Sequence, residues 1–249
     1  MNEPVTIIPF ADLLLVFIPA AAVIGILHTW SLNWHNTIYA IGRMLIQLLL
    51  IGYFLNYIFE SNNASITISI LALMMVAASW IGLRTIQGKR QVLFKFAFLA
   101  ILGGGGLTLL IVTQFVLKLS PWYTPRYMIP LAGMIFASSM NGVSLAAERL
   151  KAELDREVKY SEAKGIALKA ALIPITNSLF AVGLVSLPGM MTGQILSGIS
   201  PLIAVRYQIM VMCMIFRGCW AFILRIFSSG KIKNKMKNCI LIISIFSIL

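Results

Sequence analysis

The chain has 249 residues, of which 59% are hydrophobic and 11% are charged. Because a soluble domain carries about 25% charged residues, this composition excludes an ordinary water-soluble protein and indicates an integral membrane protein. The net charge of +12 does not indicate nucleic-acid binding. The basic residues stand in short clusters between apolar runs, a pattern that sets membrane topology and contacts lipid headgroups.

A membrane-spanning helix needs about 20 apolar residues, and we identify seven such runs. We therefore predict an all-α, polytopic membrane protein with about seven transmembrane helices. The first run is predicted to be an uncleaved span, because no basic residue precedes it. The fourth contains Gly103–Gly106, which predict a kink or a close helix contact. The predicted spans are Pro9–Leu27, Ile38–Phe59, Ile66–Leu83, Leu93–Leu117, Tyr127–Leu145, Leu168–Leu187 and Leu202–Ile223.

The distribution of lysine and arginine predicts the orientation. With the N-terminus outside and seven alternating spans, the outside holds Lys118, Arg126 and Arg206, and the other 17 of the 20 basic residues lie inside. Such an excess marks the cytoplasmic side. We predict a plasma-membrane protein with an external N-terminus and a cytoplasmic C-terminus. Residues 1–223 form the predicted transmembrane domain, and residues 224–249 form a basic tail whose final apolar stretch, 240–249, is too short to span.

The substantial polar segment is Ala146–Gly165, predicted to be a cytoplasmic helix. Leu150, Leu154 and Val158 recur every four residues and form one apolar stripe. Opposite charges follow the same spacing in Arg149–Glu153, Lys151–Asp155 and Asp155–Lys159. Two interpretations remain open: a solvated extension of the fifth span, or a helix that docks a partner. The docking candidates are Glu148, Arg149, Arg156, Glu162 and Gly165.

The stretch Leu172–Phe216 is the candidate transport path, because no charge occurs between Lys169 and Arg206. Pro188 and Gly189 are predicted to interrupt the helix there. The interruption is either a plain external hairpin or a re-entrant segment that exposes Met190, Met191 and Gln194 to substrate. The candidate path residues are Asn141, Asn177, Ser178, Pro188, Gly189, Met190, Met191, Gln194, Arg206 and Gln208.

Known catalytic and nucleotide-binding motifs do not occur: there is no GxxxxGK[ST], HExxH, GxSxG or paired CxxC. We predict a transport subunit without enzyme activity or a cofactor of its own. The 13 methionines include alternating Met210, Met212 and Met214; thioethers bind soft ions but more often fill gaps between helices. His28 and His35, beside Trp30 and Trp34, fit an interfacial aromatic loop better than a metal site.

Two long strings carry a family resemblance. They are IPLAGMIFASSMNGVSLAAERL, from Ile129 to Leu150, and the stretch Ala170–Phe216 with GLVSLPGMM and RYQIM. These strings resemble the FetB-type (YbbM) family of iron-export ABC transporter permeases, which includes plant aluminium-sensitivity relatives, and the resemblance covers residues 5–216. Two places depart from the family: the short junction at Glu162–Gly165, which faintly resembles the coupling loop of ABC importers, and the tail from Arg217.

The resemblance implies the membrane-spanning subunit of an ABC transporter that exports a metal ion such as iron. A separate subunit would bind ATP, and two permeases would pair in the complex. Its location would be a cell inner membrane. The alternatives are an ion-coupled secondary transporter acting without an ATPase, which buried acidic residues would favour, and a membrane-bound enzyme.

Overall fold

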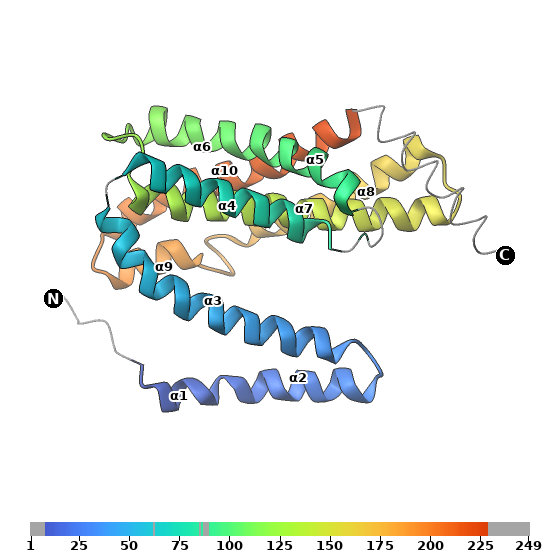
Figure 1. Cartoon of the computed structure of the whole chain (residues 1–249), viewed down its shortest axis with the longest axis horizontal. Helices are drawn as coiled ribbons and strands as arrows, with labels where there is room; N and C mark the ends of the chain where they lie inside the picture. Colours follow the sequence, from blue (N-terminus) through green and yellow to red (C-terminus); the bar gives the residue numbers. More distant parts are fainter. Residues whose placement is uncertain (1–7, 62, 85, 87–89, 229–249) are drawn as a thin grey trace. The chain divides into compact units, whose positions relative to one another are not determined.

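The computed structural model describes residues 8–61, 63–84, 86 and 90–228. The apolar stretch 240–249, predicted to be too short to span, therefore lies outside the described residues. The described part is helical, and it divides into two compact units. The first contains residues 8–61 together with 196–198, and the second contains the remaining described residues. Figure 1 shows the helices with their labels.

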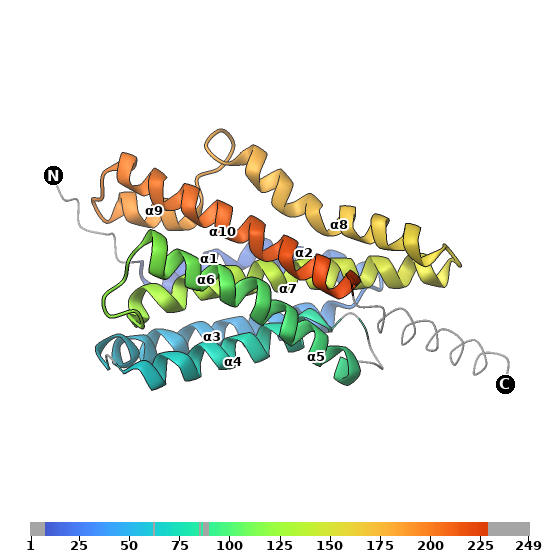
Figure 2. The same ribbon diagram turned by 90° about the horizontal axis from the view of Figure 1, so that it is seen from above.

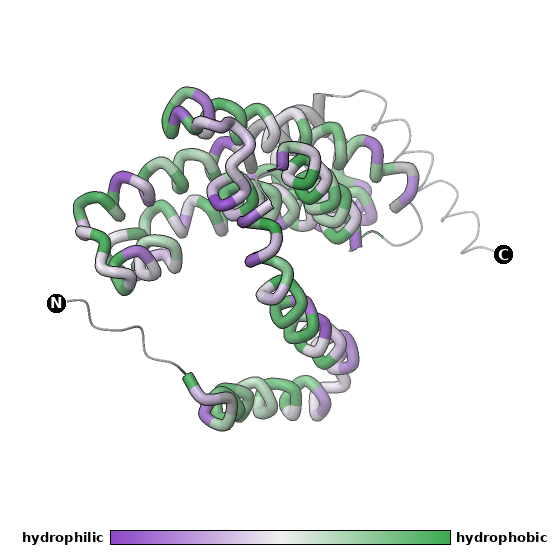
Figure 3. Tube along the Cα trace, turned by 60° about the vertical axis from the view of Figure 1, so that its left-hand side comes forward, coloured by the Kyte–Doolittle hydropathy of each residue, from purple (hydrophilic) through white to green (hydrophobic). Residues whose placement is uncertain are grey.

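Among the described residues, the first unit contains three apolar helices. α1 (Phe10–Leu15) and α2 (Phe17–Thr29) follow each other closely, and α3 (Trp34–Glu60) packs against α2. At the connection the Trp34 ring stacks on His35 at 3.6 Å and meets His28 edge-on at 5.4 Å. Much of α2 and α3 is coloured hydrophobic in Figure 3, and none of their apolar windows is buried inside the described structure, as expected for segments that face lipid rather than a protein core.

The second unit contains the remaining helices, and standard helix-start signals begin several of them. The Asn63 side chain accepts a hydrogen bond from the Ser65 amide and caps the first of them. Proline opens two others, at Pro125 and Pro201, where its missing N–H costs nothing. The helices are α4 (Ala64–Gly82), α5 (Arg90–Ile101), η1 (Leu102–Gly106), α6 (Leu107–Ile111), η2 (Val112–Val116), α7 (Pro125–Asp155), α8 (Tyr160–Ala181), α9 (Gly189–Leu196) and α10 (Pro201–Ser228).

α7 is the central helix of this unit. It packs against α4, α8 and α10, and also against α5, η1 and α6, and its side chains Leu131, Ala132, Ile135 and Phe136 are at most 2% exposed. At 31 residues it is about 46 Å long, which exceeds the roughly 30 Å hydrocarbon core of a bilayer. One end of α7 must therefore extend beyond the lipid tails.

The predicted spans compare with these helices as follows. Among the described residues, five helical stretches are long and apolar enough to cross a membrane, and they correspond to the first five predicted spans. The sixth and seventh predicted spans fall on α8 and α10. α8 begins at Tyr160 rather than Leu168, so it includes charged residues that lower its hydropathy, and it ends at Ala181 rather than Leu187. The polytopic all-α fold is confirmed.

The glycines of the fourth span make the predicted close helix contact. Gly105 lies in the π-helix η1, and a methyl group there would come within 3.0 Å of Ile135 Cγ2 and 3.2 Å of Phe136 Cε1. Both neighbours are buried on α7. At Gly106 the nearest such atom is Leu102 Cδ1 at 3.6 Å, which is ordinary contact. Gly105 therefore sets how closely η1 approaches α7.

Buried hydroxyl groups in α4 and in the fourth span donate to carbonyls of their own helix. Ser79 Oγ donates to Met75 O at 2.8 Å, Thr108 Oγ1 to Gly104 O at 2.6 Å, and Thr113 Oγ1 to Leu109 O at 2.9 Å. By contrast, Ser144 Oγ on α7 donates across to Gly82 O of α4 at 2.8 Å. These bonds satisfy buried polar groups, which would destabilise the fold if they were left unpaired.

α7 and α8 form an antiparallel hairpin, visible in Figures 1 and 2. The prediction of one continuous helix over Ala146–Gly165 is wrong: α7 ends at Asp155, and α8 begins at Tyr160. Glu157 makes the turn with φ 62°, and its amide donates to Leu154 O. Ala163, Ala167 and Ala171, at most 2% exposed, form a small-residue stripe that permits close packing of α8.

Candidate functional site

The uncharged stretch contains two separate interruptions. α8 ends at Ala181, and a turn follows in which Gly183 has φ 85°. α9 then begins at Gly189, directly after Pro188, and ends at Leu196. A second turn, with Gly198 at φ 84°, leads to Pro201 and α10. The predicted interruption at Pro188 and Gly189 was therefore misplaced, because Pro188 precedes a new helix and Gly183 supplies the left-handed backbone.

The freed backbone groups are satisfied within the turn. The Ala181 carbonyl accepts from the amides of Leu184, Val185 and Ser186 at 3.2, 2.8 and 3.2 Å. At the start of α9, Thr192 Oγ1 donates to Pro188 O at 3.2 Å. A bound solute is not needed to satisfy these carbonyls.

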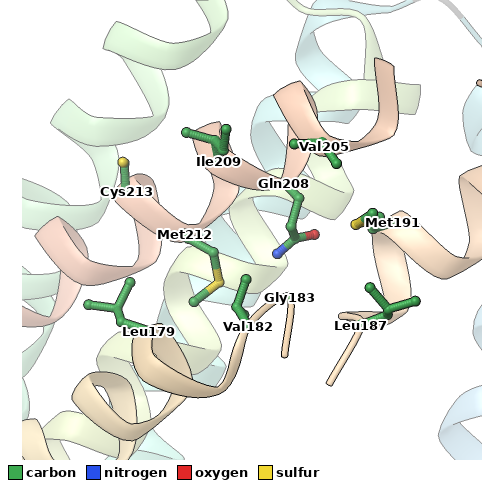
Figure 4. A pocket seen from close by; sticks show the side chains of 10 residues that line it. All are labelled: Leu179, Val182, Gly183, Leu187, Met191, Val205, Gln208, Ile209, Met212 and Cys213. Carbon is green, nitrogen blue, oxygen red and sulfur yellow. The ribbon is translucent and has the colours of Figure 1, made fainter. Parts of the chain in front are cut away.

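A pocket of about 310 Å³ opens beside these interruptions. Its walls come from the end of α8, the turn that follows, α9 and α10, and Figure 4 shows the side chains. Volumes of this size are typical of small-molecule sites. The lining residues are Leu179, Val182, Gly183, Leu187, Met191, Val205, Gln208, Ile209, Met212 and Cys213.

Among the residues that line this pocket, Gln208 supplies the amide side chain. The residue is 4% exposed, and no donor among the described residues reaches its Oε1. In Figure 4 the amide lies between the side chains of Met191 and Met212. An unpaired buried acceptor costs about 1–3 kcal/mol, so Gln208 lowers stability while the pocket is empty.

The methionines of this region lie in different environments. Met191 and Met212 line the pocket. Met190 and Met210 instead border a crevice of about 40 Å³ with Tyr207, and Met214 is 2% exposed in the core. The alternation of Met210, Met212 and Met214 does not place them together, because successive residues of a helix turn by about 100°.

The structure brings Met191 and Gln208 together among the predicted path residues, with Pro188 and Gly189 preceding Met191 at the start of α9. Gln194, also on α9, has a buried Oε1 that receives no hydrogen bond from the part of the chain that the structure describes, but it does not line this pocket. The others are exposed on three different helices: Asn141 on α7, Asn177 and Ser178 on α8, and Arg206 on α10. Met212, named above only among the alternating methionines, also lines the pocket, and its i,i+4 spacing from Gln208 is a signal for this shared face.

The docking candidates lie around the α7–α8 hairpin. Glu148 on α7, Arg156 in the turn directly after α7, and Glu162 on α8 are exposed, and Gly165 has open space beside it. Arg149 forms the predicted pair with Glu153 at 2.7 Å. The apolar stripe is already used within the molecule, since Leu150 is buried and Leu154 and Val158 pack against the same core. The surface open to a partner is therefore charged.

Two further features concern chemistry at these sites. Burial raises the pKa of the Tyr160 hydroxyl, so this group at the start of α8 stays uncharged at neutral pH. Within the described residues no group of three or more His, Cys, Asp or Glu side chains could hold a metal ion. The pocket offers neutral groups instead.

Comparison with known proteins identifies the family. The model of the uncharacterised protein family UPF0014 matches residues 10–227. The chain belongs to this family. The UPF0014 match extends beyond Arg217, so it includes the first part of the segment that departs from the FetB-type pattern. This membership confirms the recognised resemblance.

The UPF0014 relatives come from bacteria and plants. The UPF0014 membrane protein slr1647 of Synechocystis is 34% identical over 210 residues, which cover 78% of this chain and 81% of the relative. The Probable iron export permease protein FetB of Escherichia coli is 36% identical over 198 residues, covering 72% and 74%. The Arabidopsis thaliana protein ALUMINUM SENSITIVE 3 is 34% identical over 220 residues, covering 79% and 78%. No solved structure matches.

Proposed function

We propose that this chain is the membrane-spanning subunit of an ABC transporter that exports a metal ion such as iron across a cytoplasmic membrane. The observation that carries the proposal is the 36% identity to the Probable iron export permease protein FetB. A separate ATP-binding subunit would supply the energy, because the chain contains no P-loop sequence. Two copies of the chain would assemble with the ATP-binding subunits.

The α7–α8 hairpin supports the proposal physically. Its apolar residues pack inward, and its charged residues Glu148, Arg156 and Glu162 are exposed. Since α7 is longer than the hydrocarbon core is thick, the hairpin can reach beyond the membrane to a soluble partner. Under the predicted orientation, the basic residues there would lie in the cytoplasm, where ATP is available.

The function is tested with the purified complex of this chain and its ATP-binding subunit in lipid nanodiscs. We expect a transported metal to stimulate ATP hydrolysis, because substrate binding shifts the complex toward the conformation that hydrolyses ATP. The measurement is the rate of phosphate release across a panel of metal ions, with the ATP-binding subunit alone as the control. Failure of every metal to stimulate hydrolysis would contradict metal export, and failure to form the complex would contradict the ABC assignment.

The orientation is tested separately with reporter fusions. We expect a reporter placed after Ser200 to lie outside and one placed after Lys89 to lie in the cytoplasm, because lysine and arginine concentrate on the cytoplasmic side. Alkaline phosphatase, active outside, and a fluorescent protein, active inside, give opposite signals at each position. Exchanged signals would overturn the seven-span arrangement.

A further inference from the structure

The pocket beside α9 combines a mainly apolar lining, open on one side, with one buried amide oxygen that has no donor among the described residues. Leu179, Val182 and Ile209 form part of the wall. Gln208 Oε1 is buried and has no donor from the described residues. Buried polar groups in native proteins normally have a partner. Because this oxygen has almost no accessible surface, a ligand forms a hydrogen bond with it only after a neighbouring side chain such as Met191 moves aside.

The chemistry of the walls restricts what can enter. None of the residues that line the pocket is charged. Hard cations such as Mg²⁺ or Ca²⁺ require several oxygen ligands, and an anion requires donors or a positive charge. An apolar cavity of about 150 Å³ holds benzene, so about 310 Å³ accommodates a larger ring system. A neutral and mainly apolar molecule fits these restrictions.

We propose that this pocket binds a small, neutral, mainly apolar organic molecule whose N–H or O–H group donates to Gln208 Oε1. Met191, an unbranched and polarisable side chain next to the amide in Figure 4, adapts its shape to the ligand. This site is additional to metal export and does not depend on an ATP-binding subunit.

The position of the pocket along α10 indicates the route of entry. Val205 and Cys213 lie 4 and 12 residues beyond Pro201, which corresponds to about 6 and 18 Å along the helix. With the predicted orientation the pocket lies in the outer half of the bilayer. An apolar ligand reaches it through the lipid, where acyl chains, which lack a donor, are its competitors.

The test compares indole with 1-methylindole, which has nearly the same shape but lacks the N–H donor. Equilibrium dialysis measures saturable binding of each to the chain in nanodiscs, with empty nanodiscs subtracted. We expect indole to bind about three- to tenfold more tightly, the effect of one hydrogen bond. In Gln208→Leu this preference should disappear while 1-methylindole still binds. This substitution removes an unpaired acceptor and keeps the site apolar, so the chain is expected to fold.

A second pair of variants locates the site. Val205→Phe fills the pocket and should weaken binding of both probes, whereas Ile203→Phe, an exposed α10 position outside the lining, should leave both unchanged. The proposal is overturned if the wild-type chain binds both probes equally, if Val205→Phe has no effect, or if no saturable binding exceeds that of empty nanodiscs. These measurements use no ATP, so they can fail or succeed independently of the proposed transport function.

Discussion

Replacing Gly105 with alanine is expected to destabilise the protein, although alanine favours helices. The added methyl group would lie 3.0 Å from Ile135 Cγ2 and 3.2 Å from Phe136 Cε1, and these side chains are 0% and 2% exposed, so they have no free space to move into. Overpacking of this kind costs about 1–3 kcal/mol. The π-helix η1 would have to move away from α7, the helix against which most of the second unit packs.

Gly106→Ala is the matched control, because its new methyl group would meet Leu102 Cδ1 at 3.6 Å. Both variants gain the helix preference of alanine, about 1 kcal/mol. Their difference therefore isolates the contact with α7. Thermal unfolding in detergent should give a lower midpoint for Gly105→Ala than for Gly106→Ala. Equal midpoints would show that η1 and α7 are not in the close contact described.

Reversing the charges at Arg149 and Arg156 is expected to release the ATP-binding subunit. Both residues belong to the hairpin whose exposed surface is charged, and like charges brought together at an interface cost several kcal/mol. Arg149→Glu with Arg156→Glu should weaken the complex by about tenfold or more, while the chain remains in the membrane. Co-purification with the tagged ATP-binding subunit measures this, normalised to the amount of membrane-inserted chain.

Two controls separate docking from folding. Lys169→Glu makes the same charge change on α8, nine residues beyond the start of that helix at Tyr160, and should leave the complex intact. Arg149 pairs with the buried Glu153. The exchange Arg149→Glu with Glu153→Arg therefore reverses the charge at each of these two positions while preserving the ion pair between them. If the ATP-binding subunit stays bound when Arg149 and Arg156 are both replaced by glutamate, the hairpin is not the docking surface.

The sequence predicts most of the helices because long apolar runs leave little alternative in a membrane. The turn between α7 and α8 could not be predicted in the same way. It contains neither glycine nor proline, and Glu157 adopts the positive φ instead, which is uncommon for such a residue. The end of α8 was misplaced for a related reason. Gly183 stands within an apolar run, whereas Pro188, the stronger signal, begins a helix.

The candidate site, too, could be predicted from the sequence only in part. Gln208 and Met212 share one face of α10 through their i,i+4 spacing, so their proximity follows from the sequence. Met191 reaches the same pocket from α9, and this depends on two turns whose geometry no local pattern specifies. The scattered positions of Asn141 and Asn177 on α7 and α8 have the same cause. Polar residue type alone does not reveal which helix faces meet.

The hydroxyl groups of Ser79, Thr108 and Thr113 bear on how the chain enters the membrane during synthesis. Each already has its hydrogen-bond partner one turn earlier in the same helix. α4 and the fourth span leave the ribosome before α7, the helix that later covers them. Because these hydroxyls do not need α7 as a hydrogen-bond partner, each helix can be released into lipid alone without an unsatisfied hydroxyl in hydrocarbon. Helix association can then follow as a separate step, in which Ser144 of α7 joins Gly82 of α4.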